Sequence, residues 1–431
     1  MSRKPSLRVR IEPSIRSIPA EVWNACAYAH ASGRPAARSS KRLDNRTEGR
    51  QSDSVSETPD SKREVADSNS ESDPGNPFLS HAFLASLEES GAVAARTGWQ
   101  PQHVVVENGS GEILAAMPCY LKNHSQGEYV FDHGWAEAYE RAGGDYYPKL
   151  QVSVPFTPVT GPRLLVRPGP HADAAREALV AGGMELAKRR GASSLHVTFP
   201  TKIECNYLTG LGLLARTDRQ FHWLNNGYSS FDDFLAALSS RKRKAIARER
   251  REAQEGVEIV RLSGSDLTEA VWDAFFDFYM DTGSRKWGRP YLNRPFFSIV
   301  SKAMADRIVL VMARRAGRWI AGALNFLGAH TIYGRYWGAK EHRPFLHFEV
   351  CYYQAIDYAI EHDLARVEAG AQGPHKLARG YVPVTTYSAH YIADPSFRRA
   401  IADYLAHERA HVSAEAEELA TMVPFRKNAV P

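Results

Sequence analysis

The sequence has few of the features that identify several common classes of protein. Only four cysteines occur in 431 residues, and none stands in a CxxC or CxxH pair. We therefore expect neither a metal site nor a disulfide framework. There is also no P-loop, no GxSxG motif and no HExxH motif. These absences argue against a P-loop kinase, a hydrolase with a nucleophile elbow and a zinc metalloprotease.

Long apolar runs are missing as well, and the excess of positive charge is small. No stretch approaches the roughly 18 to 20 apolar residues that cross a membrane. The start, MSRKPSLRVRIEP, lacks the apolar core of a secretion signal, so we expect a cytoplasmic protein without a transmembrane segment. A net charge of +5 permits anionic ligands, but it is below what dedicated nucleic-acid binders usually carry.

Aromatic residues are absent between Tyr28 and Phe78, where Ser, Asp, Glu, Arg and Pro dominate. Such a segment cannot bury enough apolar surface to offset its ordering entropy, so we predict a disordered insert over 30–76. The predicted division of the chain is a strand and helix at 1–29 that join the first domain, a first domain at 77–220, a second at 221–395, and a C-terminal helix and tail at 396–431.

The richest stretch lies between Thr331 and Tyr381. TIYGRYWGA is rich in aromatic and β-branched residues and contains Gly334 and Gly338, which predicts a strand that is locally bulged or closely approached. Apolar residues then recur at helical spacing after Pro344. A second strand, ARVEAGA, ends in the polar loop QGPHKLARGY, and ligands of open α/β sheets bind at such strand ends.

The order of elements recurs about 200 residues apart, which predicts an internal duplication. In the first half we expect a hairpin of 113–120 with 129–136, a helix around 171–190 and the strand SSLHVTF. The second half repeats hairpin, helix and strand. Both hairpins contain a Gly and Trp pair, Gly134 with Trp135 and Trp337 with Gly338. The alternative is that any two mixed α/β domains share this order.

The loop 143–167 is rich in Pro and Gly and therefore has a defined shape. Tyr146, Tyr147, Lys149 and Arg163 are candidates to line a binding groove there. The alternative is a structural lid packed on the sheet.

Several segments, in this order, resemble the FemAB-like group of predicted N-acyltransferases, relatives of the Fem-type peptidyl and aminoacyl transferases. The segments are NPFLSHAFLASLEESG, HSQGEYVFDHGWAEAYERAGGDYYPKL, PFTPVTGPRLL, QFHWLNNGYSSFDDFLAALSSRKRKAIARERR, YGRYWGAKEHRPFLHFE and EAGAQGPHKLARGY. The resemblance implies a bacterial enzyme of mixed α/β fold with two tandem GNAT-like domains. It also implies acyl or aminoacyl transfer to an amine, with a peptidoglycan-related molecule as the expected acceptor.

GNAT folds splay two neighbouring strands, and here the splayed pair would be 331–339 and 366–371. Glu368 lies among apolar neighbours, so either a buried partner such as Arg335 or a proton-transfer role must explain it. Glu349 stands in the first turns of a helix, where a structural role competes with catalysis. His375 and Lys376 follow a Gly-Pro turn and are expected to face ligand. The candidate catalytic residues are Glu368, Glu349 and His375, and the candidate substrate-binding residues near them are Arg335, Tyr336, Trp337, Gln372, Lys376 and Arg379.

A basic run, RKRKAIARERR over 241–251, crowds positive charge into the first turn of a helix predicted over 239–254. This arrangement favours an anion such as phosphate, with Arg243 and Lys244 as binding candidates, although a solvated basic face is the usual explanation. Ser230 and Asp233 predict a capping box for the helix before it.

The Arg/Gln-x-x-Gly-x-Gly/Ala loop with which GNAT enzymes hold the pyrophosphate of CoA is not found, which weakens acetyl-CoA as donor. We expect no tightly bound cofactor, and acyl-CoA or aminoacyl-tRNA as co-substrate. The alternative function is a non-catalytic protein that recognises a cell-wall precursor or another phosphate-bearing ligand.

Overall fold

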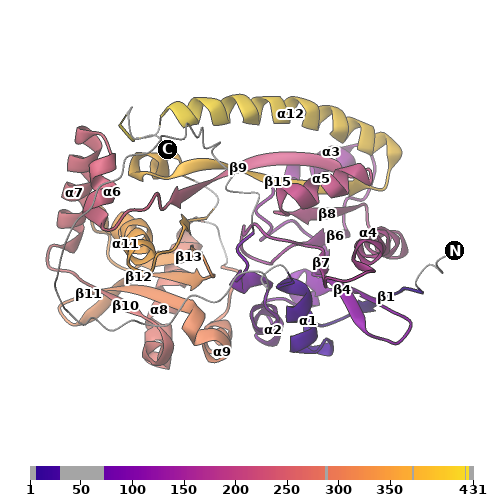
Figure 1. Cartoon of the computed structure of the whole chain (residues 1–431), viewed down its shortest axis with the longest axis horizontal. Helices are drawn as coiled ribbons and strands as arrows, with labels where there is room; N and C mark the ends of the chain where they lie inside the picture. The colour runs from indigo at the N-terminus through magenta and orange to yellow at the C-terminus, as the bar shows by residue number, and fades with distance from the viewer. Residues whose placement is uncertain (1–5, 30–71, 287–289, 371–372, 423, 427–431) are drawn as a thin grey trace, which may run out of the picture.

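The computed structural model describes residues 6–29, 72–286, 290–370, 373–422 and 424–426. Most of the predicted insert, at 30–71, therefore lies outside the described residues. The strands form one sheet of eleven and one of four. Figure 1 shows the N-terminal half on the right and the C-terminal half on the left, with the long helix α12 (Pro395–Thr421) running across both.

The small sheet and two helices open the first half. The order of strands in the small sheet is β1 (Arg8–Glu12), β3 (His103–Glu107), β4 (Ile113–Met117) and β7 (Leu165–Val166). Strand β1 pairs antiparallel with β3. Helices α1 (Ala20–Ala27) and α2 (His81–Glu89) pack beside them. The strand and the helix predicted at the start of the chain are both present.

The remaining elements of the first half join the large sheet or cover it. They are β2 (Trp99–Pro101), β5 (Cys119–Lys122), β6 (Lys149–Val152), β8 (Ser194–Thr198), α3 (His133–Arg141), α4 (Ala172–Arg189) and α5 (Lys202–Gly210). The predicted helix around 171–190 and the strand SSLHVTF are confirmed as α4 and β8.

The hairpin predicted from 113–120 and 129–136 is wrong. Strand β4 pairs with β3 and β7 instead, and 133–136 is the first turn of helix α3. Trp135 and Ala136 are buried against Ile401 and Leu405 of α12, contacts with a distant segment that a local pattern cannot report. The two Gly and Trp pairs therefore lie in different kinds of element, one in a helix and the other in a strand.

The second half follows the predicted order more closely. Its elements are β10 (Glu258–Leu262), α8 (Glu269–Lys286), α9 (Arg294–Met304), β11 (Ile308–Arg315), β12 (Arg318–Leu327), β13 (Thr331–Ala339), α10 (Leu346–Phe348), a π-helical turn (Glu349–Tyr353), α11 (Gln354–Glu361) and β14 (Arg366–Glu368). The predicted hairpin, helix and strand are confirmed as β12 with β13, α10 to α11, and β14.

The predicted bulge in β13 is also confirmed. Leu324 of β12 pairs with Tyr336 and Asn325 pairs with Gly334, so Arg335 is the extra residue. The close approach lies at Gly338, where an added Cβ would stand 2.2 Å from the carbonyl of Phe278 in α8. Helix α8 therefore rests directly on β13.

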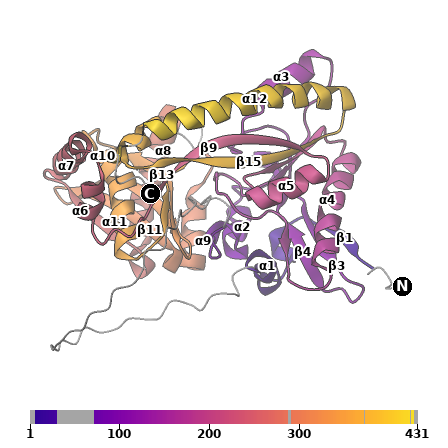
Figure 2. The same ribbon diagram turned by 45° about the horizontal axis from the view of Figure 1, so that its top comes forward.

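Two long strands join the halves. Strand β9 (Leu214–Leu224) follows the first half in sequence but pairs with β14 of the second, whereas β15 (Val382–Ile392) follows the second half and pairs with β8 of the first. The two strands also pair with each other, and α12 packs across them (Figure 2). The boundary predicted between 220 and 221 falls inside β9, and the domain limits stay a prediction.

Helices α6 (Phe231–Ala237) and α7 (Ser240–Gln254) stand at the edge of the second half, at the left of Figure 1. The Ser230 hydroxyl accepts a hydrogen bond from the backbone N–H of Asp233, as the predicted cap requires. Short 3₁₀ turns occupy Ile15–Ser17, Pro77–Leu79, Ala95–Thr97, Gly264–Asp266, Ala305–Arg307 and Pro374–Arg379. In the part of the chain that the structure describes, no helix is long and apolar enough to cross a membrane.

Candidate active site

Strands β13 and β14 run parallel and then separate. Their pairing covers Thr331 with Arg366, Ile332 with Val367 and Tyr333 with Glu368. Beyond these pairs β13 continues to Ala339, while β14 ends at Glu368. Among the described residues the pairing therefore stops at the carboxyl end of β14 and midway along β13, and ligands of open α/β sheets bind at such strand ends.

Glu368 and Arg335 form a buried ion pair at this point. Arg335 Nη2 lies 3.2 Å from Glu368 Oε2, and the two side chains are 2% and 3% exposed. Arg366 Nε stands 4.0 Å from the other carboxylate oxygen. Of the two explanations that the sequence left open for Glu368, the structure provides the buried partner. Its role in proton transfer stays a prediction.

Lys376 is buried, not exposed to ligand as its place after a Gly-Pro turn predicted. It is 1% exposed, and its ammonium donates to the carbonyl of Gly370 over 2.9 Å. No carboxylate among the described residues pairs with it. Burial, with the nearby Arg335 charge, lowers the pKa of Lys376 to about 7. Lys376 is buried because the 3₁₀ turn folds back and places Leu377 and Tyr381 in the core.

His222 of β9 completes this group, and the sequence analysis missed it. It stands opposite Glu368 in the sheet, and burial lowers its pKa to about 4, with Glu368 opposing and Arg335 and Lys376 assisting. The signal was present in QFHWL, where Gln220 and His222 alternate with large aromatic residues. We call His222, Arg335, Glu368 and Lys376 the splay cluster.

Three buried polar atoms near the splay cluster lack a hydrogen-bond partner among the described residues. They are His222 Nδ1, Arg335 Nε and Asn325 Oδ1. The Asn325 oxygen would lie 3.3 Å from a Cβ added at Gly334, the residue before the bulge. Unpaired buried polar atoms are rare because they are costly, which singles out this part of the sheet as a candidate site.

Glu349 lies in the π-helical turn and holds helix α7. It is 0% exposed, and its carboxylate accepts hydrogen bonds from Arg250, Gln254 and Gln354. Every one of these partners belongs to α7 or to the helix that Glu349 begins. The contacts favour the structural alternative, and a catalytic role stays a prediction.

The other predicted residues of the second half are spread around the splay cluster. His375 is exposed and its Nε2 lies 2.9 Å from the Tyr352 hydroxyl. Arg379 stacks 3.3 Å above the Phe348 ring and pairs with Glu249 of α7. Trp337 packs edge-on against His347. Gln372 lies outside the described residues.

Tyr147 and Lys149 belong to a buried network in the first half. Lys149 Nζ lies 2.7 Å from Glu128 Oε2 and 2.5 Å from Asp132 Oδ2. Ser125 accepts from the same ammonium and also contacts the Tyr147 hydroxyl. Arg163 is likewise buried, with its guanidinium donating to backbone carbonyls. These contacts favour the structural lid over the groove for the loop 143–167.

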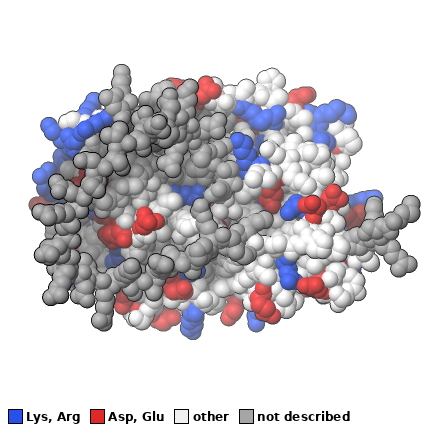
Figure 3. All heavy atoms as spheres, in the orientation of Figure 1, with Lys and Arg blue, Asp and Glu red and all other residues white. Residues whose placement is uncertain are grey.

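The basic run forms the exposed face of α7. Arg243 is half-buried and Lys244 is exposed, whereas Arg250 is turned inward toward Glu349 and Asp357. Figure 3 shows basic side chains gathered at the left edge, where Figure 1 places α7. The exposed cations of this helix are Arg241, Lys244, Arg248 and Arg251.

Comparisons with known proteins give a family and a fold. A family model described as FemAB-like, peptidoglycan biosynthesis/recognition, matches residues 61–427. The crystal structure of FemX is similar with a TM-score of 0.50 and 14% identity, over 78% of this chain and 97% of that one. A search of curated proteins found no match.

Two further solved structures are more distant. One is a tandem GNAT protein from the clavulanic acid biosynthesis pathway, with a TM-score of 0.46 and 13% identity over 90% of this chain and 99% of that one. The other is L-PGS from Bacillus licheniformis, with a TM-score of 0.46 and 10% identity over 80% of this chain and 96% of that one. The fold expected from the sequence, mixed α/β with tandem GNAT-like halves, is confirmed. The chain belongs to the FemAB-like family.

Proposed function

We propose that this protein is an N-acyltransferase that moves an acyl or aminoacyl group to an amine, with a peptidoglycan-related molecule as acceptor. The observation that carries the proposal is the splay cluster. Two parallel strands part beside a buried ion pair and a buried lysine that pairs with no carboxylate among the described residues. Family membership and the tandem GNAT-like fold support the same reaction class.

The reaction needs a base, an oriented carbonyl and a donor for the developing oxyanion. The acceptor nitrogen bonds to the acyl carbon, the bond from that carbon to its leaving oxygen or sulfur breaks, and the amine proton passes to the base. Lys376, with a pKa of about 7, and Glu368 are the two candidate bases. Arg335 Nε, buried without an acceptor among the described residues, is the candidate oxyanion donor.

Thermal shift of the purified protein identifies the donor, because a ligand that binds only the folded state raises the melting temperature. The panel contains acetyl-CoA, longer acyl-CoAs, aminoacyl-tRNA and nucleotide-linked muramyl peptides. Transfer is then assayed with the stabilising donor and an amine acceptor. We expect Glu368→Gln to remove most activity while the protein stays folded.

The pH profile separates the two bases. If Lys376 accepts the proton, kcat/KM of the wild type rises as pH increases through about 7, and Lys376→Met removes that rise. A Glu368→Gln variant with full activity would remove Glu368 from the mechanism. No turnover with any donor in the panel would count against the enzyme itself.

A second candidate function is recognition of a phosphate-bearing cell-wall precursor without catalysis. The exposed cations along α7 favour it. In that case the muramyl nucleotide binds without turnover, and Arg243→Glu with Lys244→Glu weakens binding in a salt-dependent way.

A further inference from the structure

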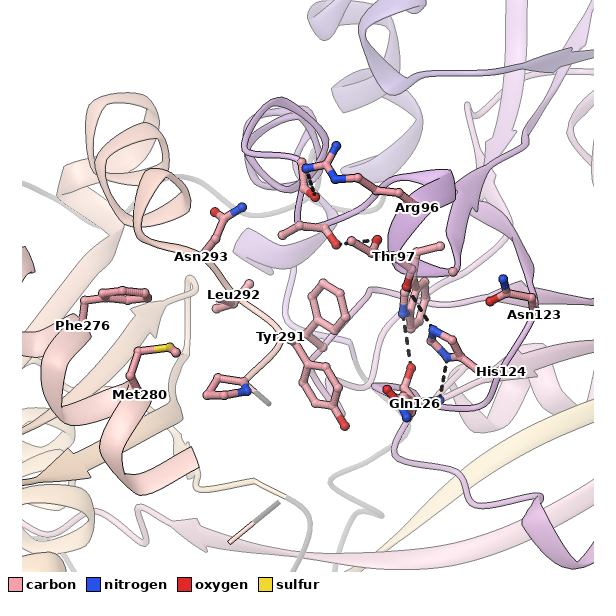
Figure 4. Close-up of a pocket in the computed structure, with 16 residues that line it drawn as sticks. Arg96, Thr97, Asn123, His124, Gln126, Phe276, Met280, Tyr291, Leu292 and Asn293 are labelled. Atoms are coloured by element: carbon pink, nitrogen blue, oxygen red, sulfur yellow. Dashed lines mark hydrogen bonds between the residues drawn. The ribbon is translucent and has the colours of Figure 1, made fainter. Parts of the chain in front are cut away.

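A cavity of about 590 Å³ lies between the two halves of the molecule. The first half contributes Arg96, Trp99, Asn123, His124, Gln126 and Phe156, and the second half contributes Phe276, Met280, Leu292 and Asn293, among others. Figure 4 shows Phe276 and Met280 facing the side chains of the first half, with Tyr291 between them. Its volume is typical of a small-molecule site.

The two walls of the cavity differ in chemistry. The described lining residues from α8 and from 290–292 are mainly apolar, with Phe276, Met280, Pro290 and Leu292. The opposite wall carries polar side chains, and Asn293 lies beside the apolar wall. Among the described lining residues, Arg96 is the one with a formal charge. A polyhydroxylated ligand would need polar partners on all sides, whereas a flexible apolar chain suits a wall that contains a methionine.

One aromatic residue of the cavity wall has a strained backbone. Phe156 has a φ of 62°, in the left-handed region that bulky residues rarely adopt. Its ring stacks on Tyr291 with centroids 5.2 Å apart and planes 7° apart, although Tyr291 is still 36% exposed. Strain of this kind persists where the surroundings enforce it, often at ligand sites.

The cavity adjoins the splay cluster through one residue. The Tyr336 hydroxyl donates to the carbonyl of Phe156 over 2.8 Å, so the cavity wall contacts the residue that follows Arg335 in β13. Tyr336 also packs edge-on against Tyr279 of α8, the helix that supplies the apolar wall. One hydrogen bond and one ring contact therefore join the cavity wall to the bulged part of β13.

We propose that this cavity binds an apolar acyl chain, and that the protein accepts donors with chains longer than acetyl. The proposal rests on the transferase function above and names its substrate class. The chain lies against Phe276, Met280 and Leu292, and its carbonyl end points toward Tyr336 and Arg335.

Calorimetric titration with the straight-chain carboxylates butanoate, hexanoate, octanoate and decanoate tests the cavity without any need for turnover. Burial of each added methylene should tighten binding about fourfold until the cavity is full. Met280→Glu should weaken decanoate binding at least tenfold, because it places a charge in the apolar wall. Tyr291→Ser, at a partly exposed position, is a second variant that removes the stacked face.

Ile203→Glu is the matched control, since it adds the same charge at a residue that is 69% exposed on α5. Affinity that does not depend on chain length, or an equal loss in Met280→Glu and Ile203→Glu, would overturn the cavity proposal. Chain-length-dependent binding with no turnover of any donor would support the cavity proposal and contradict the proposed transferase function. Turnover with no preference for chain length would support the transferase function and contradict the cavity proposal.

Discussion

At the scale of single residues, burial has changed the chemistry of one lysine. Lys376 donates to the backbone carbonyl of Gly370 and lies near Arg335 and His222. With no carboxylate partner among the described residues, its charged form is disfavoured. Such a lysine can hold a free amine at neutral pH, which is what a general base requires.

We predict that Lys376 makes stability depend on pH. Its pKa is about 7 in the folded protein against 10.5 for the free side chain. Between these two pKa values the unfolded chain holds one more proton than the folded one. The contribution of Lys376 to the free energy of unfolding therefore increases as pH rises across this window and decreases as pH is lowered toward 7. In the wild type this increase in the free energy of unfolding should be on the order of 3 kcal/mol, and in Lys376→Met it should be absent. Urea unfolding from pH 6.5 to 10 measures both.

Lys188→Met removes a lysine that is exposed on α4 and is the control for a general loss of charge. Parallel pH curves for wild type and Lys376→Met would show that the lysine keeps its charge on folding.

At the scale of elements, the π-helical turn and α7 form one unit. Glu349 lies at the start of the turn and accepts from Arg250 and Gln254 of α7. Arg379 and Tyr353 reach Glu249 on the same helix. The basic helix is therefore held on its inner face by ion pairs, and its outer cations, including Arg248, which pairs with Glu252, face solvent. π-Helical turns often mark functional sites.

We expect Glu349→Ala to destabilise the protein by about 3 kcal/mol, because it leaves the buried end of Arg250 with only Asp357. Hydrogen exchange should show faster opening of α7. The control is Glu252→Ala, whose partner Arg248 lies on the exposed face, with a change within about 0.5 kcal/mol. A Glu349→Gln variant that is stable but inactive would instead favour the catalytic role.

At the scale of the whole molecule, the exchange of β9 and β15 makes the two halves depend on each other. Each strand completes the sheet of the half to which it does not belong in sequence. Helix α12 packs across both strands and forms ion pairs with β9, among them Arg216 with Glu408. Neither half has a complete sheet without the other.

The full chain should therefore unfold in one cooperative transition, with coincident midpoints by far-UV circular dichroism and tryptophan fluorescence. Deletion of 382–431 should unfold the first half as well, because β8 and β9 lose their shared partner. Two separate midpoints in the full chain, or a folded first half after the deletion, would show that the halves are independent.

Local patterns in the sequence were sufficient for much of the second half. The alternation and glycines of 331–339 predicted a bulged strand, and Ser230 predicted a helix cap, because backbone geometry and capping depend on near neighbours. The segments that resemble the FemAB-like group led to the correct fold. For Glu368 the sequence predicted either a buried partner such as Arg335 or a role in proton transfer; the partner is present, and the catalytic role stays a prediction.

Contacts between distant segments decided the rest. The stretch 129–136 has the composition of a strand, but Trp135 packs on α12 and the segment begins a helix. Lys376 was expected at the surface and is buried within the 3₁₀ turn Pro374–Arg379. His222 joins the splay cluster only because β9 crosses to the second half. Burial, and with it the pKa of a lysine or histidine, depends on neighbours that folding brings from far along the chain.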